Sequence, residues 1–191
     1  MKKFFALLLS LAMVLALVAC GQKDPTPDTP DTPDDPQTKV EYKVAMITDY
    51  GDITDQSFNQ TTYEACKAFA EKNNIEFKYY KPAGDNTADR VAMIESAVEE
   101  GFNVIVMPGY AFGGAIVEAA PQHKDVKFIA LDVAKGDLLE AGVAKAGEKY
   151  DYTPDNWELE KYVDMSNVYC AIYKEELCGY MAGYAAVKLG Y

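Results

Sequence analysis

Short apolar or β-branched runs alternate with stretches of helical spacing from residue 42 onward, and this alternation limits the possible folds more than any other feature of the sequence. The run 104–107 is apolar throughout, and the run 126–131 is apolar apart from Lys127, as expected of strands buried on both sides of a sheet. The order of the segments is typical of an α/β protein, in which a parallel sheet has helices on both faces. The predicted strands are 43–48, 75–80, 103–107, 126–131 and 168–173, and the predicted helices are 57–73, 85–100, 111–120 and 175–189.

The segment between the fourth and fifth predicted strands does not follow this rhythm. Residues 133–166 contain Trp157, several tyrosines and many charges, without a clear helical or strand period. Connections longer than ~15 residues in a compact domain are usually functional or mobile. The sequence therefore predicts a long connection here and leaves its role open.

The start of the chain has the features of an exported protein that stays at the membrane. Lys2 and Lys3 precede an apolar run, 4–19, that is short for the ~20 residues of a membrane-spanning helix. Residues 17–20 (Leu-Val-Ala-Cys) resemble a lipobox, so we predict a lipoprotein signal peptide over 1–19 and a lipid such as palmitate on Cys20. An ordinary signal peptide and a retained anchor are the alternatives.

Residues 20–40 are predicted to be a tether, because they are rich in Pro, Asp and Thr and contain nothing that builds a core. Such a chain is extended and semi-rigid, reaching ~3 Å per residue. We expect a protein that is anchored to the cell membrane by its lipid and faces the exterior or the periplasm.

The charge balance and the single histidine exclude several functions. The chain has 18 basic and 30 acidic residues and a formal charge of −12, which becomes −14 when Lys2 and Lys3 leave with the signal peptide. So acidic a chain is repelled by nucleic acids. His123 alone cannot form a multi-histidine metal site, and a single histidine argues against a histidine-dependent triad. We therefore predict no catalytic residues, no metal and no cofactor.

Three further cysteines follow the predicted tether. Cys66, Cys170 and Cys178 lack the spacing of a metal or redox motif, so we interpret them as small apolar residues. A disulfide between Cys170 and Cys178 stays open for an exported protein.

Chemistry-bearing residues follow three of the predicted strands at their carboxyl ends, where open parallel sheets bind ligands. Asp49 opens the loop after the first strand, and Asp132 follows the fourth. Gly109 and Tyr110 follow the third. Carboxylates accept hydrogen bonds from hydroxyl and amino groups, and glycine allows close approach to the backbone. The combination suits a neutral ligand that is polyhydroxylated or heteroaromatic.

Each candidate also has a structural interpretation. Asp55 or Ser57 can simply cap the helix 57–73. Phe58, in the first turn of that helix, can be a core residue, and Asp132 can be a solvated turn residue. The case for a site rests on several strand ends that meet at one edge.

The segment 55–60 (Asp-Gln-Ser-Phe-Asn-Gln) closely resembles the D-x-S-F-N-Q signature of the basic membrane protein family. Members of this family are substrate-binding lipoproteins of ABC transporters, and many bind purine nucleosides. The resemblance continues through 104–110, 127–132 and 173–186 and spans roughly residues 42–191. The first and last of these motifs are fairly specific, whereas the strands are not.

The resemblance implies the N-terminal lobe of a type I periplasmic-binding fold, over 41–173, with 174–191 as the start of a second lobe that is essentially absent. In such proteins Phe58 would stack on the base and Asn59 would bind its edge. Asp49 and Asp132 would accept hydrogen bonds from the ligand. The predicted ligand-binding set is Asp49, Ser57, Phe58, Asn59, Gly109, Tyr110 and Asp132.

The resemblance also implies partners: a purine nucleoside, and the permease and ATPase subunits of an ABC importer. Two departures from the family qualify it, because 133–166 is longer than the usual connection and the chain stops at Tyr191. We therefore hypothesise a truncated gene product that binds nucleoside weakly or not at all.

Three other functions stay open. One is a receptor of the same fold for a sugar or another small polar ligand, and a second is a surface adhesin or sensor. The third is a nucleoside hydrolase-like enzyme with the pattern D-x-D-x-x-x-D-D. Gly51 stands where that pattern has its second Asp, and Gln56 follows Asp55, so two of the four acids are missing.

Overall fold

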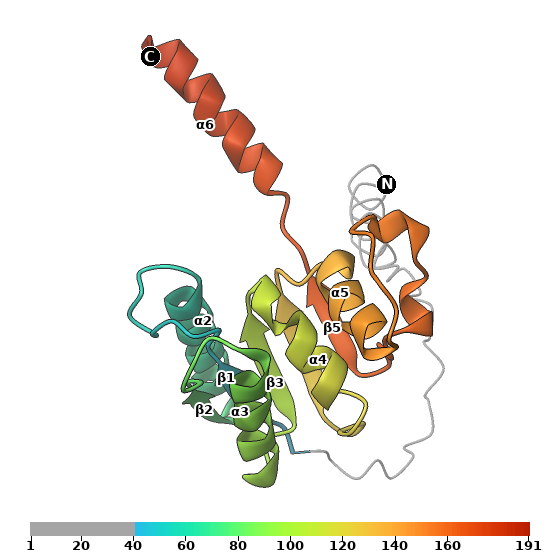
Figure 1. Ribbon diagram of the computed structural model, residues 1–191. Coiled ribbons are helices and arrows are strands. Elements are labelled where there is room, and N and C mark those ends of the chain that lie inside the picture. The colour runs from blue at the N-terminus through green and yellow to red at the C-terminus, as the bar shows by residue number, and fades with distance from the viewer. Residues whose placement is uncertain (1–40) are drawn as a thin grey trace, which may run out of the picture. The chain divides into compact units, whose positions relative to one another are not determined.

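The computed structural model describes residues 41–191 and contains one five-stranded sheet in which every neighbouring pair of strands is parallel (Figure 1). The predicted signal peptide, Cys20 and the tether lie outside the described residues. The strand order is β2-β1-β3-β4-β5. The strands are β1 (Lys43–Ile47), β2 (Glu76–Tyr80), β3 (Val104–Pro108), β4 (Lys127–Leu131) and β5 (Val168–Ala171).

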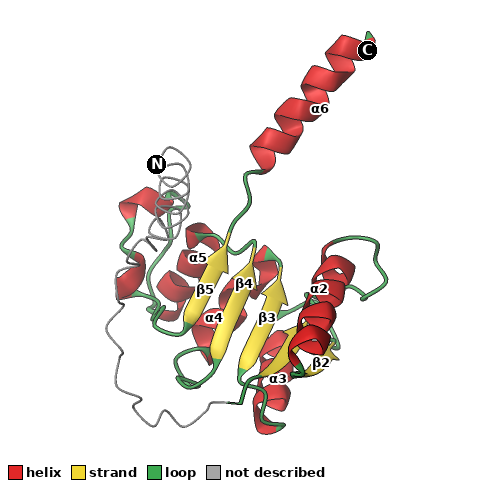
Figure 2. Ribbon diagram, turned by 180° about the vertical axis from the view of Figure 1, so that it is seen from behind, coloured by secondary structure: helices red, strands yellow, loops and turns green. Residues whose placement is uncertain are grey.

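Helices lie on both faces of this sheet, which confirms the predicted α/β class (Figures 1 and 2). Helix α2 packs on one face against the first three strands, and α3, α4 and α5 follow one another across the other face. The helices are α2 (Phe58–Asn73), α3 (Thr87–Glu99), α4 (Gly113–Ala119), α5 (Lys135–Lys145) and α6 (Glu175–Leu189), with 3-10 turns η1 (Tyr110–Phe112), η2 (Pro154–Asn156) and η3 (Leu159–Lys161).

The largest cluster of buried side chains lies between the sheet and the layer of α3, α4 and α5. Fully buried residues of β3 and β4, such as Ile105 and Phe128, meet Ile94 of α3 and Ile116 of α4 there. The face under α2 is less apolar, because the buried residues of that helix are Asn59, Thr62 and Ala70. The α2 side therefore carries polar groups toward the sheet close to the strand ends.

The long connection over 133–166, for which the sequence shows no clear period, contains α5 and two 3-10 turns. Leu138, Leu139 and Val143 are buried at helical spacing, but the glycines among them obscured the pattern. A side chain at Gly142 would place its Cβ atom 2.9 Å from a methyl group of Val163. Glycine is present there because the chain after η3 packs directly against α5.

An aromatic cluster completes this segment. Tyr150 is buried against Leu139 and Val143, with Trp157 and Tyr162 packed beside it. The indole nitrogen of Trp157 donates to a carboxylate oxygen of Asp151 over 2.7 Å. The segment is thus a small folded layer that extends the core.

Helix α6 matches the predicted helix 175–189 and contributes nothing to the core. None of its residues is buried, and Tyr180 and Met181 are 71% and 69% exposed. It continues beyond β5 (Figure 1). Among residues 41–191, no helix has both the length and the apolar character needed to cross a membrane.

Removal of residues 174–191 is expected to change the free energy of unfolding by less than ~1 kcal/mol, because no buried surface is lost. Leu139→Ala is the control, since it truncates a fully buried side chain and should cost ~2–5 kcal/mol. Urea unfolding of both variants measures the difference. A loss on truncation as large as that of Leu139→Ala would show that α6 packs against the domain in solution.

Candidate functional site

The carboxyl ends of the strands meet at one edge of the sheet, because all five strands are parallel. Asp49 follows β1, Gly109 follows β3 and Asp132 follows β4. Backbone hydrogen bonds join these ends in sequence: the Gly109 amide donates to the Leu131 carbonyl over 2.8 Å, and the Asp132 amide donates to the Ala171 carbonyl over 2.7 Å. The ends of β3, β4 and β5 are therefore tied to one another at this edge.

Gly109 needs to be glycine at this edge. Its φ of +117° lies in the region that other residues rarely adopt. A Cβ atom here would lie in van der Waals contact with the Asp49 side chain, at 3.8 Å.

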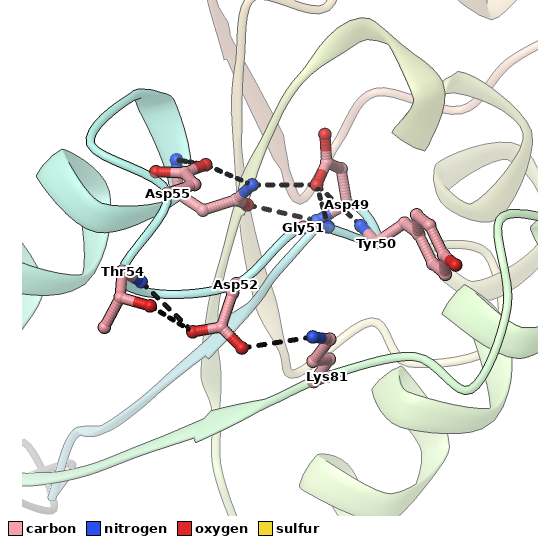
Figure 3. A network of polar contacts seen from close by, with 8 residues as sticks. Asp49, Tyr50, Gly51, Asp52, Thr54, Asp55 and Lys81 are labelled. Carbon is pink, nitrogen blue, oxygen red and sulfur yellow. Dashed lines mark hydrogen bonds and ion pairs between the residues drawn. The ribbon is translucent and has the colours of Figure 1, made fainter.

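Asp49 is held by three donors that share one of its oxygens. Its Oδ1 accepts from the amide of Tyr50 at 2.6 Å, the amide of Gly51 at 2.8 Å and the Asn59 side-chain amide at 2.9 Å (Figure 3). Among residues 41–191, no side-chain or backbone group donates to its Oδ2. The carboxylate thus has one oxygen committed to the protein and one available as an acceptor.

The pKa of Asp49 lies below its usual value. Partial burial alone raises this pKa, but the hydrogen bonds from Gly51, Asn59 and Tyr50, together with the charge of Arg90, more than offset burial. Asp49 is therefore an anion at neutral pH and a strong hydrogen-bond acceptor.

Asp55, and not Ser57, caps α2. Its carboxylate accepts from the backbone amides of Ser57, Asn59 and Gln60 at 2.8, 3.3 and 3.1 Å, whereas the Ser57 side chain makes no capping hydrogen bond. Burial raises the pKa of Asp55, but the hydrogen bonds from Asn59, Gln60 and Ser57 outweigh it and hold this pKa below its usual value. The predicted capping role thus falls to Asp55, and Ser57 is exposed.

Asn59 is buried, and its amide group is occupied by the protein. The side-chain nitrogen donates to Asp49 Oδ1 at 2.9 Å and to Asp55 Oδ2 at 3.0 Å, and its oxygen accepts from the Asp49 amide at 3.3 Å. Both N–H donors are used in this way. Asn59 links the end of β1 to the start of α2 in the structure, and its predicted contact with a ligand stays a prediction.

A third acid, Asp52, fixes the outer part of the same loop. Asp52 accepts from the backbone and side chain of Thr54 and from Lys81, whose ammonium group is 3.2 Å away (Figure 3). These bonds lower the pKa of Asp52. Residues 41–191 contain no cluster of three or more acidic, histidine or cysteine side chains that would hold a metal ion.

A cavity of about 330 Å³ opens between these strand ends, and we call it the strand-end cavity. Two larger hollows lie elsewhere, against α2 and β2 and between α4 and α5, where no such network of polar groups is found. The strand-end cavity is lined by Asp49, Tyr50, Gly51, Asp55, Asn59, Asp85, Arg90, Gly109, Tyr110 and Ala111.

Four of the seven predicted ligand-binding residues line this cavity: Asp49, Asn59, Gly109 and Tyr110. Ser57, Phe58 and Asp132 do not. The half-buried ring of Phe58 stands edge-on to that of Tyr173, with 6.0 Å between the ring centroids. Asp132 has a φ of +61°, the left-handed conformation that a turn requires.

Sequence reasoning missed two charged residues of the cavity, Asp85 and Arg90. Arg90 is 4% exposed, its Nε donates to the backbone oxygen of Asp49 over 2.9 Å, and its Nη2 forms an ion pair with Asp85. A signal was present, because Arg90 is the single arginine among 18 basic residues.

Comparison with known proteins decides the family. A family model described as ABC transporter substrate-binding protein PnrA-like, named Bmp, matches residues 42–190. The chain belongs to the Bmp family. The resemblance read from the segment 55–60 is thereby confirmed.

Individual Bmp relatives are similar over part of their length. The CD4+ T-cell-stimulating antigen of Listeria monocytogenes serovar 1/2a is 33% identical over 138 residues, which cover 69% of this chain and 37% of that protein. The ABC transporter nucleoside-binding protein BmpA of Lactococcus lactis subsp. cremoris is 23% identical over 184 residues, covering 94% of this chain and 42% of that protein. The chain thus spans about two fifths of the length of these relatives.

Among solved structures, the 5-methylthioribose transporter solute-binding protein of Thermotoga lettingae, in complex with 5-methylthioribose, is 16% identical. The match covers 77% of this chain and 37% of that chain, with a TM-score of 0.48.

Proposed function

We propose that this Bmp chain forms the ligand-binding part of a lipid-anchored receptor of an ABC importer, and that its ligand is a purine nucleoside. The observation that carries the proposal is the free Oδ2 of Asp49 at the strand-end cavity. A rigid, charged acceptor suits a ribose hydroxyl or a base N–H, which would each donate to it. The relative BmpA of Lactococcus lactis is a nucleoside-binding protein, which supports the same class of ligand here.

Other residues at the carboxyl ends of the strands support this proposal. Gly109 allows close approach of a ligand to the backbone, and Tyr110 is 69% exposed at the cavity. We propose that Phe58 stacks on the base, since an aromatic face contributes ~1–3 kcal/mol per stacked base. Asn59 would then contribute by holding Asp49 and Asp55 in place. Asp132 would accept a hydrogen bond from a ligand that extends over the end of β4.

The proposed partners and location follow from the family and the sequence. An importer of this kind pairs its receptor with a permease and an ATPase, and we propose such partners here. We propose that a lipid on Cys20 holds the domain at the outer face of the membrane. Substrate binding without chemistry is the family's role, so we propose no enzymatic step.

The charges of the cavity favour a nucleoside over its phosphorylated form. Asp49, Asp55 and Asp85 face the cavity with Arg90 as the single cation among the lining residues. A phosphate dianion placed here meets an excess of negative charge, and its desolvation is not compensated.

Calorimetric titration of the full chain with guanosine and with guanosine 5′-monophosphate tests this function. We expect guanosine to bind at least ~10-fold more tightly, a difference of ~1.4 kcal/mol. Ribose serves as the control. If ribose binds and guanosine and adenosine do not, the ligand is a sugar and not a nucleoside. Binding of neither class would contradict a receptor function for this chain, and release of free base would make it a hydrolase.

A further inference from the structure

The guanidinium of Arg90 joins three segments that build the strand-end cavity. It projects from α3, bonds the backbone of Asp49 after β1, and pairs with Asp85 ahead of α3. Its carbon Cζ also lies 5.8 Å from the ring centroid of Phe112, at the end of η1 after β3. One side chain therefore fixes how three loops lie around the cavity.

Burial makes this arrangement specific. The Arg90 side chain is 5% exposed, and a buried cation is costly unless it is paired and hydrogen-bonded. The planar fork of arginine donates in two directions at once, to the Asp49 backbone and to Asp85. Lysine, the other basic residue of this chain, has no such fork, which explains why an arginine stands at this one position.

The hydrogen bond from Arg90 acts on the backbone of Asp49 and not on its carboxylate. Arg90 Nε binds the backbone oxygen of Asp49, while Asn59 and two loop amides bind the side-chain Oδ1. Together they fix both the backbone and the side chain of Asp49. The rotation that presents Oδ2 to the cavity is thus set by the protein before a ligand arrives, which lowers the ordering cost of binding.

We propose that Arg90 is a positioning residue of the binding site, which holds the loop after β1 so that the free oxygen of Asp49 faces the ligand. The effect of Arg90 on ligand binding rests on the proposed function. The contacts of Arg90 with Asp49 and Asp85 do not, because they are present without a ligand. The positioning role is one that neither the family description nor the sequence motif gives to Arg90.

The test uses the amide protons of Tyr50 and Gly51, because both donate to Asp49 Oδ1 and report its ionisation and position. Nitrogen–proton NMR spectra of the ligand-free full chain are recorded between pH 2 and pH 7 for the wild type and for Arg90→Met, which keeps the apolar stem. The charged or titratable groups around Asp49 are Asp55, Asp85, Arg90, Tyr50 and Tyr110.

For Arg90→Met we expect the midpoint seen at the two amides to move to higher pH, and their hydrogen exchange to become faster. The amide of Phe128, in the middle of the sheet, serves as an internal reference for global stability. Asp85→Asn is the matched control, since it removes the ion pair and keeps the hydrogen bond from Arg90 to Asp49. In this variant the midpoint and the exchange rates of the Tyr50 and Gly51 amides should stay close to those of the wild type. An unchanged midpoint and exchange rate in Arg90→Met would overturn the proposal.

Arg90→Lys covers the case in which Arg90→Met does not fold. It keeps the charge, so a positioning role predicts faster exchange at Tyr50 and Gly51 with Phe128 unaffected, and wild-type exchange at all three amides would overturn it. Guanosine affinity is then measured on whichever variant folds, with an expected loss of ~10-fold or more. Absence of guanosine binding in the wild type contradicts the proposed function, whereas the ligand-free amide data decide the role of Arg90 separately.

Discussion

Phe112→Ala is expected to destabilise the domain by ~3–5 kcal/mol, the largest stability effect that we predict. The Phe112 ring is fully buried where η1 passes into α4, within the cluster between the sheet and its helices. Its removal leaves a cavity under the strand-end edge and takes away the aromatic face beside Arg90. For a domain of this size, the loss corresponds to a decrease of about 10 °C in Tm.

Two matched variants separate this effect from the mere loss of a phenyl ring. Phe69→Ala makes the same deletion on α2, where the side chain is 55% exposed, and should change the stability by less than ~1 kcal/mol. Phe112→Leu keeps most of the buried volume and should cost ~1–1.5 kcal/mol. Urea unfolding with a shared m-value ranks the three variants. Equal losses for Phe69→Ala and Phe112→Ala would contradict the assignment of Phe112 to the core.

Most of the architecture was predictable because a parallel sheet produces short apolar runs that alternate with segments of helical spacing. Both faces of β3 and β4 are covered or partly covered, so these strands are apolar except for the exposed Lys127 at the start of β4. Gly101, with a φ of +88°, ends the helical stretch before β3. Helix α5 was missed because its glycines serve close packing against the chain near Val163, a tertiary contact that leaves no periodic signal.

The candidate site was only partly predictable. Asp49 and Gly109 follow from topology alone, since they lie within two residues of the ends of parallel strands. Asn59 was correctly predicted to lie at the site, but only the structure shows that its side-chain amide is hydrogen-bonded to Asp49 and Asp55. Arg90 could not be placed at the site from its position within a helix, because its contact with Asp49 joins residues 41 apart in sequence.

Asp49→Asn is expected to weaken guanosine binding by ~10- to 100-fold, or ~1.5–3 kcal/mol, with a small effect on the fold. The three donors at Oδ1 would retain the amide oxygen of the new side chain in that place. Its NH₂ group would then face the cavity, so that a donor replaces the acceptor offered by Oδ2. A hydroxyl can rotate to accept from this group, whereas a base N–H cannot, so the loss should be larger for contacts to the base.

The pH dependence of the same variant provides an independent check. Because the pKa of Asp49 is lowered in the folded state, its carboxylate stabilises the native protein above the ordinary value of 3.8, and this stabilisation is lost as the pH falls through the lower native pKa. The free energy of unfolding of the wild type should thus exceed that of Asp49→Asn by a constant amount between pH 5 and pH 7, and the difference should shrink below pH ~4. Urea unfolding at pH 7 and pH 3 measures it. A difference that grows on acidification would mean that burial, and not the donors at Oδ1, controls this carboxylate, and Asp49 would then lose its place as the charged acceptor of the site.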